Sequence, residues 1–398
     1  MNDPLDLSQP AEPLHDDADV SERAPEPPPK RGAGAKLQLP PPPVITAPPA
    51  VAADDAGIAQ ASGVLKAGGL VAFPTETVYG LGADASNAQA VARIFAVKGR
   101  PRNHPLIVHL ASADDLATWA VDVSEDARQL ARAFWPGPLT LILKRAESVL
   151  DAVTGEQDTV AVRVPSHPKA LALLEAFGGG IAAPSANKFG RISPTTPDHV
   201  RLDLGQEVDL VLDGGACEIG IESTIVDCSG ERPRLLRPGK ITATEIEALL
   251  GEPLTGNAVT EVVAGVAPRV PGSHESHYAP RAALKLVARR RDFTDELAVH
   301  RGRRIAILAL EISVPRIAPP LQRVLPASAA LYARELYGKL RELDETGADL
   351  ILVEAPPASA QWAGVTDRLQ RAQHAHVRSA KTVKADAPWK KKAAVDAT

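Results

Sequence analysis

The sequence predicts an α/β protein with two domains, the first larger than the second. Its 398 residues are enough for about two or more domains at the usual ~100–200 residues each. Short apolar runs of strand length alternate with segments of helical period in two separate blocks of the chain. A stretch rich in Gly and Pro at residues 251–282, without sustained periodicity, separates the two blocks.

Both ends of the chain differ in composition from the two blocks. Residues 1–52 hold 13 of the 36 prolines and few large apolar side chains, so this extension cannot bury enough surface to offset its ordering entropy. We expect it to be disordered, and a docking motif for another protein within it is an alternative. Residues 378–398 carry Lys381, Lys384 and Lys390–Lys392, which predict a solvated basic tail, although such tails can also touch RNA.

The first block, residues 53–250, predicts a mixed α/β domain with a large sheet. The apolar run Leu70–Phe73 is typical of a buried strand. Residues 87–98 show helical spacing, with Asn87 as the N-cap and Gly99 as the residue that ends the helix. Further strands are expected at Leu106–His109, Leu139–Leu143, Val160–Val164, Ile181–Ala183, Val208–Leu212 and Thr224–Val226, and further helices near 125–134, 168–177 and 243–250.

The second block, residues 283–377, predicts a smaller, Rossmann-like α/β domain. Strand–helix alternation of this kind indicates a small, open, largely parallel sheet. The expected strands are Leu284–Val287, Ile305–Leu310 and Leu350–Val353, and the expected helices lie near 292–300, 328–346 and 366–376. The 251–282 segment is longer than an ordinary loop in a compact domain, and long loops often serve as lids.

Composition disfavours several classes of protein. A net charge of −5 and a pI near 6.1 give no global reason to expect stable nucleic-acid binding. The two cysteines, Cys217 and Cys228, match no ligand or redox spacing, which disfavours a disulfide framework and a cysteine zinc site. The sequence shows no signal-peptide core and no run of ~18 apolar residues, so we expect a cytoplasmic protein without a membrane segment.

Polar side chains follow the first buried strand in the motif FPTETVYGLG, residues 73–82. Hydroxyl, carboxylate and phenol groups placed where a strand ends are well positioned to meet a small ligand. The alternative is a strand-to-loop turn with a satisfied threonine cluster, ending at Gly80 and Gly82.

Cations gather in the next motif, KGRPRNHPLIVH, residues 98–109. Lys98, Arg100 and Arg102 flank a tight Gly/Pro turn, and the glycine lets the backbone approach a ligand closely. Arginine and lysine bind phosphate oxygens through charge-assisted hydrogen bonds. A solvated basic turn is the alternative, and His109 could be a satisfied sheet histidine, but three cations beside a constrained turn favour an anion site.

Small polar residues follow later strands. In APSANKFGRISPT, Ser185 comes after a strand and Ser193 lies beyond it, and such groups can bind phosphate or ribose without steric conflict. A serine nucleophile is disfavoured because the chain has no G-x-S-x-G elbow. The motifs IESTIVD and LLRPG add Ser223 and Arg237 at strand ends. Because a P-loop and a convincing dinucleotide fingerprint are both missing, residue chemistry alone predicts a phosphate-binding α/β enzyme of another kind.

These motifs, in this order, resemble those of the YrdC-type threonylcarbamoyl-AMP synthase family. The second block and the segment SHYAP (276–280) resemble the long two-domain form of that family, and the resemblance covers residues 56–376. It implies a twisted α/β sheet around a positively charged cavity. It also implies a nucleotidyltransferase that converts L-threonine, bicarbonate and ATP to L-threonylcarbamoyladenylate, diphosphate and water, the first step of tRNA N6-threonylcarbamoyladenosine biosynthesis.

The resemblance also implies site residues. A threonine pocket would consist of Thr77, His109, Arg163, Ala183 (through its backbone) and Ser223. ATP contacts would come from Arg100, His104, Thr159, Ser185, Ser193, Arg237 and Tyr278, and the catalytic cations would be Lys98 and Arg100. Many relatives have Asn where this chain has His104, which introduces a protonatable group at that contact.

In the implied reaction, the threonine amine takes up carbon dioxide or bicarbonate, and the resulting N-carboxylate attacks the α-phosphate of ATP. Both reactants are anionic, so fixed cations and a Mg²⁺ ion that arrives with ATP, rather than on protein ligands, would offset their repulsion. Arg163 suits the threonine carboxylate, and Lys98, Arg100 and Arg237 suit the triphosphate. No residue must act as a general base. Closure of the 251–282 segment would exclude water, and hand-off of the product to a separate tRNA threonylcarbamoyl transferase is expected.

Two other classes compete with this interpretation. An RNA-binding module would use the cations at 98–102, but the acidic balance and the 4% aromatic content offer few stacking platforms. A carbamoyl-adenylate enzyme of hydrogenase maturation would need zinc-type cysteine sets and an acylphosphatase-like domain. Two cysteines cannot supply such sets.

Overall fold

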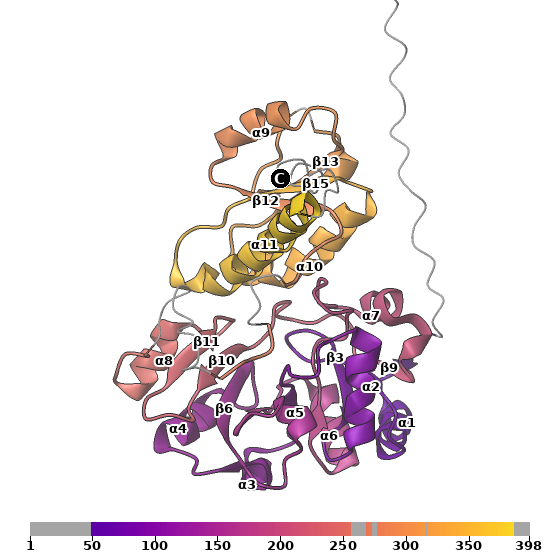
Figure 1. Ribbon diagram of the computed structural model, residues 1–398, viewed down its shortest axis with the longest axis vertical. Coiled ribbons are helices and arrows are strands. Elements are labelled where there is room, and N and C mark those ends of the chain that lie inside the picture. Colours follow the sequence, from indigo (N-terminus) through magenta and orange to yellow (C-terminus); the bar gives the residue numbers. More distant parts are fainter. Residues whose placement is uncertain (1–48, 256–267, 273–276, 316, 386–398) are drawn as a thin grey trace, which may run out of the picture. The chain divides into compact units, whose positions relative to one another are not determined.

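The computed structural model describes residues 49–255, 268–272, 277–315 and 317–385. It confirms the predicted α/β class, with two separate sheets (Figure 1). Most of the Pro-rich extension, the middle of the 251–282 segment and the end of the basic tail lie outside the described residues. Within the described ranges, no helix is long and apolar enough to cross a membrane.

The first sheet has 11 strands in a mixed arrangement. Its order is β1 (Val51–Ala52), β9 (Leu210–Asp213), β2 (Val71–Phe73), β3 (Gly80–Asp84), β8 (Ile181–Ala182), β4 (Ile107–His109), β7 (Thr159–Arg163), β6 (Leu139–Arg145), β10 (Thr224–Asp227) and β11 (Arg234–Arg237), with β5 (Ala120–Val121) beside β6. Strands β4 and β7 are parallel, whereas β8 is antiparallel to β4. Each strand run predicted in this block is present, with ends that differ by no more than two residues.

Helices cover both faces of the first sheet. Helices α1 (Asp55–Lys66) and α6 (Pro168–Phe177) pack against each other and contribute to one apolar cluster. The second cluster includes residues of α2 (Ala88–Lys98), α3 (Leu116–Trp119), α4 (Glu125–Phe134), α5 (Asp151–Thr154), α7 (Pro197–Leu204) and α8 (Ala243–Leu250). The alternation of strand β2 separates the two, because Val71 and Phe73 belong to the first cluster and Ala72 to the second.

The predicted ends of helix α2 are confirmed. The Asn87 side chain accepts hydrogen bonds from the backbone N–H groups of Gln89 and Ala90, and Gly99 ends the helix with a φ of 63°. A residue without a side chain adopts this left-handed conformation at little cost. The glycine therefore turns the chain from the helix into the segment that carries Arg100.

The sequence prediction missed helices α1 and α7. Helix α1 contains two glycines and several small residues, which give a weak helical signal. Gly57 lies so close to the preceding strand that a Cβ there would be 1.9 Å from the carbonyl oxygen of Ala52. That strand, β1, pairs Val51 with Leu212, so the sheet begins inside the segment that the sequence assigns to the extension.

The motif at residues 73–82 differs from its predicted form. Gly80 and Gly82 were expected to end a loop, but they lie in β3, which runs antiparallel to β2. A Cβ on Gly82 would come within 2.8 Å of the Ile181 side chain, so the glycine allows close packing inside the sheet. Residues 74–79, with the polar side chains of Thr75, Glu76 and Thr77, therefore connect two adjacent strands.

The second sheet confirms the predicted small parallel domain. Its strands are all parallel, in the order β12 (Ala283–Val287), β15 (Leu350–Glu354), β13 (Ile305–Leu310) and β14 (Gln322–Leu325). Strand β14 was not predicted, because its short sequence QRVL is half polar. Helices α10 (Ala329–Glu345) and α11 (Ala363–Ala385) pack on one face, and α9 (Phe293–Val299) contributes to the core of the other face (Figure 1). Helix α11 continues past residue 378, where the sequence predicts the tail to begin.

Short connecting turns complete the described elements. Single 3-10 turns lie at Ala113–Asp115, Gly205–Glu207, Arg290–Asp292, Pro319–Leu321 and Ala360–Trp362. The two sheets belong to one compact unit of the chain. An ion pair joins their domains, with a nitrogen of Arg341 in α10 lying 2.6 Å from an oxygen of Asp203 in α7.

Candidate active site

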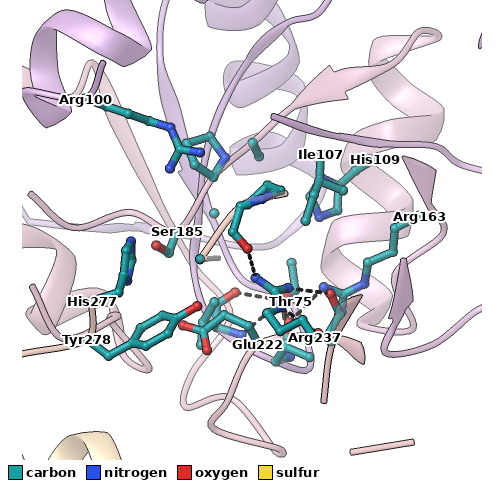
Figure 2. Close-up of a pocket in the computed structure, with 18 residues that line it drawn as sticks. Thr75, Arg100, Ile107, His109, Arg163, Ser185, Glu222, Arg237, His277 and Tyr278 are labelled. Carbon is teal, nitrogen blue, oxygen red and sulfur yellow. Dashed lines mark hydrogen bonds between the residues drawn. The ribbon is translucent and has the colours of Figure 1, made fainter. Parts of the chain in front are cut away.

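A cavity lies where several strands of the first sheet end, and residues of the interdomain linker contribute to its wall (Figure 2). It brings together nine of the predicted site residues, which are Thr77, Arg100, His109, Arg163, Ala183, Ser185, Ser223, Arg237 and Tyr278. The other lining residues are Thr75, Val78, Gly80, Ile107, Pro184, Glu222, Pro271, Gly272 and His277. Four predicted residues, Lys98, His104, Thr159 and Ser193, do not line it.

Arg163 is held in place at the end of β7. Its Nε donates to the carbonyl oxygen of Gly137 at 3.2 Å, and its Nη1 donates to the Thr77 hydroxyl at 2.9 Å. Its Nη2 lies 2.6 Å from a carboxylate oxygen of Glu76, and both side chains are 4% exposed. This pair is close but not aligned as a hydrogen bond. Because a guanidinium has five N–H donors, Arg163 keeps donors that can bind an anion in the cavity.

His109 lies beside Arg163, because the two residues are register partners at the ends of the parallel strands β4 and β7. Burial, followed by the charge of Arg163, lowers the pKa of His109 to about 3. The imidazole is therefore neutral at physiological pH. Its buried Nδ1 has no hydrogen-bond partner in the described part of the chain, so a ligand that fills the cavity can supply one.

Two further buried arginines line the cavity. Arg100 donates from Nη2 to the carbonyl oxygen of Pro105 at 3.0 Å and lies over the Phe189 ring at 5.9 Å. Burial lowers the pKa of Arg100 to about 10, so it still carries its charge at neutral pH. Arg237 donates to the carbonyl oxygen and the hydroxyl of Ser223, at 3.0 Å each. Neither guanidinium forms an ion pair with a carboxylate in the described ranges.

Lys98 does not lie where the sequence predicts it. Its Nζ donates to the backbone carbonyl oxygens of Ser185 and Asn187, and the side chain is buried. Burial, followed by the nearby charge of Arg100, lowers the pKa of Lys98. Lys98 therefore fixes the loop that presents Ser185 to the cavity and does not itself line the cavity.

The three other predicted residues also lie outside the cavity wall. The His104 ring packs against the Phe189 ring, with centroids 5.4 Å apart. Thr159 begins strand β7, at the end opposite Arg163. Ser193 donates its hydroxyl hydrogen to Glu222 at 2.5 Å, so it contributes to the cavity through that carboxylate.

The linker forms one side of the cavity. Figure 2 shows His277 and Tyr278 on the side opposite His109 and Arg163. Tyr278 has a φ of 61° and a buried hydroxyl without a hydrogen-bond partner in the described residues, and burial raises its pKa. A Cβ on Gly272 would lie 2.1 Å from that hydroxyl. The glycine therefore allows the tyrosine to lie against the other linker segment.

Sequence reasoning missed several lining residues. Thr75 belongs to a motif that the sequence singled out, and its hydroxyl bonds Thr77 at 2.8 Å. His277 adjoins Tyr278, so the same segment carried the signal. Glu222 was the strongest missed signal, because it is the carboxylate next to Ser223 in the motif IESTIVD, just before β10.

Family models match both parts of the chain. Residues 63–239 match the Sua5/YciO/YrdC model, which is described as "Telomere recombination". Residues 241–373 match the model of the threonylcarbamoyl-AMP synthase C-terminal domain. The two matches meet at residue 240, before the 251–282 segment, so the second match includes the predicted linker.

Individual relatives match over most of their length. A threonylcarbamoyl-AMP synthase from Pyrococcus abyssi is 41% identical over 77% of this chain and 91% of its own. One from Bacillus subtilis is 39% identical over 77% of this chain and 90% of its own. Among solved structures, P. abyssi Sua5 complexed with L-threonine is 40% identical, with a TM-score of 0.76 over 81% of this chain and 95% of the other.

Proposed function

The chain belongs to the threonylcarbamoyl-AMP synthase family in its two-domain form, and we propose that its cavity performs the corresponding reaction. L-Threonine, bicarbonate and ATP would enter, and L-threonylcarbamoyladenylate, diphosphate and water would leave. The similarity to a structure of P. abyssi Sua5 complexed with L-threonine supports the amino-acid substrate. ATP, bicarbonate and the roles of individual residues are parts of the proposal.

The observation that carries the proposal is the presence of three buried arginines around one cavity. Arg163 has the Glu76 carboxylate beside it, whereas Arg100 and Arg237 contact backbone carbonyls and a hydroxyl. Burying a cation without a carboxylate in direct contact is costly. The cavity therefore suits ligands with several anionic groups, as an amino acid and a triphosphate together have.

We place threonine on the side formed by His109 and Arg163. The free donors of Arg163 suit the threonine carboxylate. The neutral His109 ring can accept a hydrogen bond, and the hydroxyls of Thr77 and Ser223 can meet the polar side chain. Both hydroxyls are themselves fixed, because Thr77 accepts from Arg163 and Ser223 accepts from Arg237. The backbone of Ala183 lines the same cavity.

We place ATP between Arg100, Ser185, Arg237 and Tyr278. The two arginines suit the phosphate oxygens, and Ser185 is a small donor held by the contact of Lys98 with its carbonyl oxygen. Tyr278 lies on the opposite side of the cavity from Arg163 (Figure 2). This placement of ATP does not include the predicted contacts with His104, Thr159 and Ser193, because these residues do not line the cavity.

The chemistry follows from these positions. The threonine amine would condense with bicarbonate, releasing water and forming an N-carboxylate. One oxygen of that group then forms a bond to the α-phosphorus while the bond from this phosphorus to the bridging oxygen breaks, and diphosphate leaves with the electron pair. Arg100 and Arg237 stabilise the charge on the phosphates, and holding both anions in one cavity supplies the orientation.

The described residues fit a Mg²⁺ ion that is carried by ATP. They contain no cluster of three or more His, Cys, Asp or Glu side chains that could hold a metal. Glu222 is the carboxylate that lines the cavity, and both of its oxygens accept hydrogen bonds from protein groups. Mg²⁺ often keeps several waters and binds through substrate phosphates, and there it would neutralise phosphate charge.

The linker side of the cavity would protect the product. A carbamate adenylate hydrolyses readily, and a closed site excludes water from it. Pro271 accepts a hydrogen bond from Arg237 at 2.9 Å, and Tyr278 is 2% exposed. These contacts hold linker residues against the cavity. Release to a separate tRNA threonylcarbamoyl transferase would then require the linker to move.

We also propose that the reaction takes place in the cytoplasm. The two cysteines are unpaired and buried. Free thiols are typical of proteins in a reducing compartment.

The test is a diphosphate-release assay with each substrate omitted in turn. We expect release to require ATP, L-threonine and bicarbonate together, and mass spectrometry of the quenched reaction to detect the threonylcarbamoyl adenylate. Equal ATP cleavage without threonine would refute this assignment. An α-hydroxy acid analogue that lacks the amine is the matched control, and it should not support release.

A further inference from the structure

Glu222 is a carboxylate in the wall of a cavity that otherwise presents positive charge. It is 6% exposed and lies directly before Ser223, which also lines the cavity. One oxygen accepts from the Ser193 hydroxyl at 2.5 Å. The other accepts from the Tyr337 hydroxyl at 3.0 Å and from Nε of Arg368 at 2.7 Å. Two of these three donors belong to helices α10 and α11 of the second domain.

Arg368 links Glu222 to the strands that carry the cavity residues. It is 1% exposed. Its Nη2 donates to the carbonyl oxygen of Glu222 at 3.2 Å, and its Nη1 donates to that of Pro238 at 2.9 Å. These two carbonyls immediately precede Ser223 and follow Arg237. The Arg368 guanidinium of the second domain therefore fixes the backbone next to Ser223 and next to Arg237, two first-domain residues that hydrogen-bond each other.

The charges in this cluster balance. Burial raises the pKa of Glu222, but the charges of Arg368 and Arg237, with hydrogen bonds from Arg368 and Ser193, hold it below its ordinary value. Glu222 is therefore ionised. Asp367 also contacts Arg368, but it has Arg371 as a second cationic partner at 2.9 Å. The positive charge of Arg368 is thus left to offset Glu222.

An ionised carboxylate in this position would repel both proposed substrates. Threonine N-carboxylate and ATP are anions, and a buried charge is poorly screened by solvent. Within the first domain, the direct donor to Glu222 is the neutral hydroxyl of Ser193. The cation in contact with this carboxylate comes from the second domain.

We propose that Arg368 is a positioning residue of the site, through which the second domain neutralises Glu222 and fixes the segments that carry Ser223 and Arg237. The proposal rests on the function proposed above. It gives the second domain a defined role in the chemistry of the first. Without Arg368, Glu222 would keep its negative charge in the cavity wall beside the bound anions and would lose the cation in direct contact with it. Tyr337 supports the same carboxylate by a neutral hydrogen bond.

The test separates charge compensation from a general loss of domain contact. Arg368→Met leaves Glu222 charged and without its cation, so we expect KM for ATP and for threonine to rise about tenfold or more. Adding Glu222→Gln removes the charge, and the double variant should recover to within about threefold of Glu222→Gln alone. Asp203→Asn is the matched control. It removes the charge of another interdomain ion pair, 2.6 Å from Arg341 and outside the cavity, while Arg341 keeps its hydrogen bond to the carbonyl oxygen of Ile192, and it should leave both KM values unchanged.

Several outcomes would overturn the proposal. It is wrong if Arg368→Met leaves both KM values unchanged, if the double variant is as impaired as Arg368→Met, or if Asp203→Asn raises both KM values equally. If Arg368→Met does not fold, Arg368→Lys decides: lysine keeps a positive charge beside Glu222, so both KM values should rise less than about threefold, and a tenfold rise would refute charge compensation. Failure of the function itself is distinguishable, because the wild-type protein would then release diphosphate without needing threonine and bicarbonate.

Discussion

Replacing Arg163 with lysine separates two roles of this guanidinium. One is to stay beside the buried Glu76 carboxylate, 2.6 Å away. The other is to offer donors to the substrate carboxylate in a planar fork. Lysine keeps the charge for Glu76 but loses the fork, so we expect a folded protein that binds threonine poorly.

The magnitude follows from the contacts. Losing a hydrogen bond to a charged group costs about 1.5–3 kcal/mol, and 1.4 kcal/mol corresponds to a factor of ten. KM for threonine in Arg163→Lys should therefore rise about 10- to 150-fold, with KM for ATP changed much less. Arg163→Met should instead lower the free energy of unfolding by about 3–5 kcal/mol, because it leaves a buried carboxylate unpaired.

The assay is diphosphate release at saturating ATP with threonine varied, together with thermal unfolding of each variant. Arg145→Lys is the matched control, because Arg145 ends the neighbouring strand β6 and pairs with the exposed Asp151, outside the cavity. An unchanged threonine KM in Arg163→Lys would refute the placement of the amino acid. An equal rise in the KM for ATP would show that Arg163 does not distinguish the two substrates.

Two further predictions concern the linker and a buried histidine. Gly272→Ala should weaken ATP binding, because a φ of 79° strains a residue with a side chain and the new Cβ would lie 2.1 Å from the Tyr278 hydroxyl. Unchanged nucleotide affinity in calorimetry would contradict the linker's role in ATP binding. Because the pKa of His109 is lowered from 6.5 to about 3, the unfolded chain binds more protons there than the folded protein between these values. Its contribution to stability is thus complete above pH 6.5 and declines as the pH falls toward 3. In denaturant unfolding, the free energy of unfolding should fall less between about pH 7 and pH 4.5 in His109→Gln than in wild type. An equal fall in both proteins would refute this prediction.

Much of the fold follows from local sequence signals. Helix α2 was predicted with both ends, because Asn87 satisfies the first backbone N–H groups and Gly99 turns left-handed, and both effects act within a few residues. Helix α1 was missed because glycines inside it obscure the periodicity. Gly57 is explained only by the approach of Ala52, which lies in a strand that pairs with β9.

In the candidate site too, some features follow from local sequence and others only from tertiary contacts. The motifs near residues 77, 100, 185, 223 and 237 were predicted to carry anion-binding groups, and the cavity collects residues from all of them. Lys98 was predicted to face phosphate because a cation beside a glycine turn has that local chemistry. The fold instead places its ammonium on two carbonyls of a loop far along the chain.

By itself, the sequence determined the two α/β blocks, the residue types that bind anions and the family to which they belong, because strand patterns, caps and motifs are properties of neighbouring residues. The tertiary structure decided which cations face the cavity and which bind backbone carbonyls. It also decided that Glu222 receives its counter-charge from Arg368, 146 residues later. Spacing along the chain cannot show such a pairing, because the energy of a buried charge depends on whatever the fold places beside it.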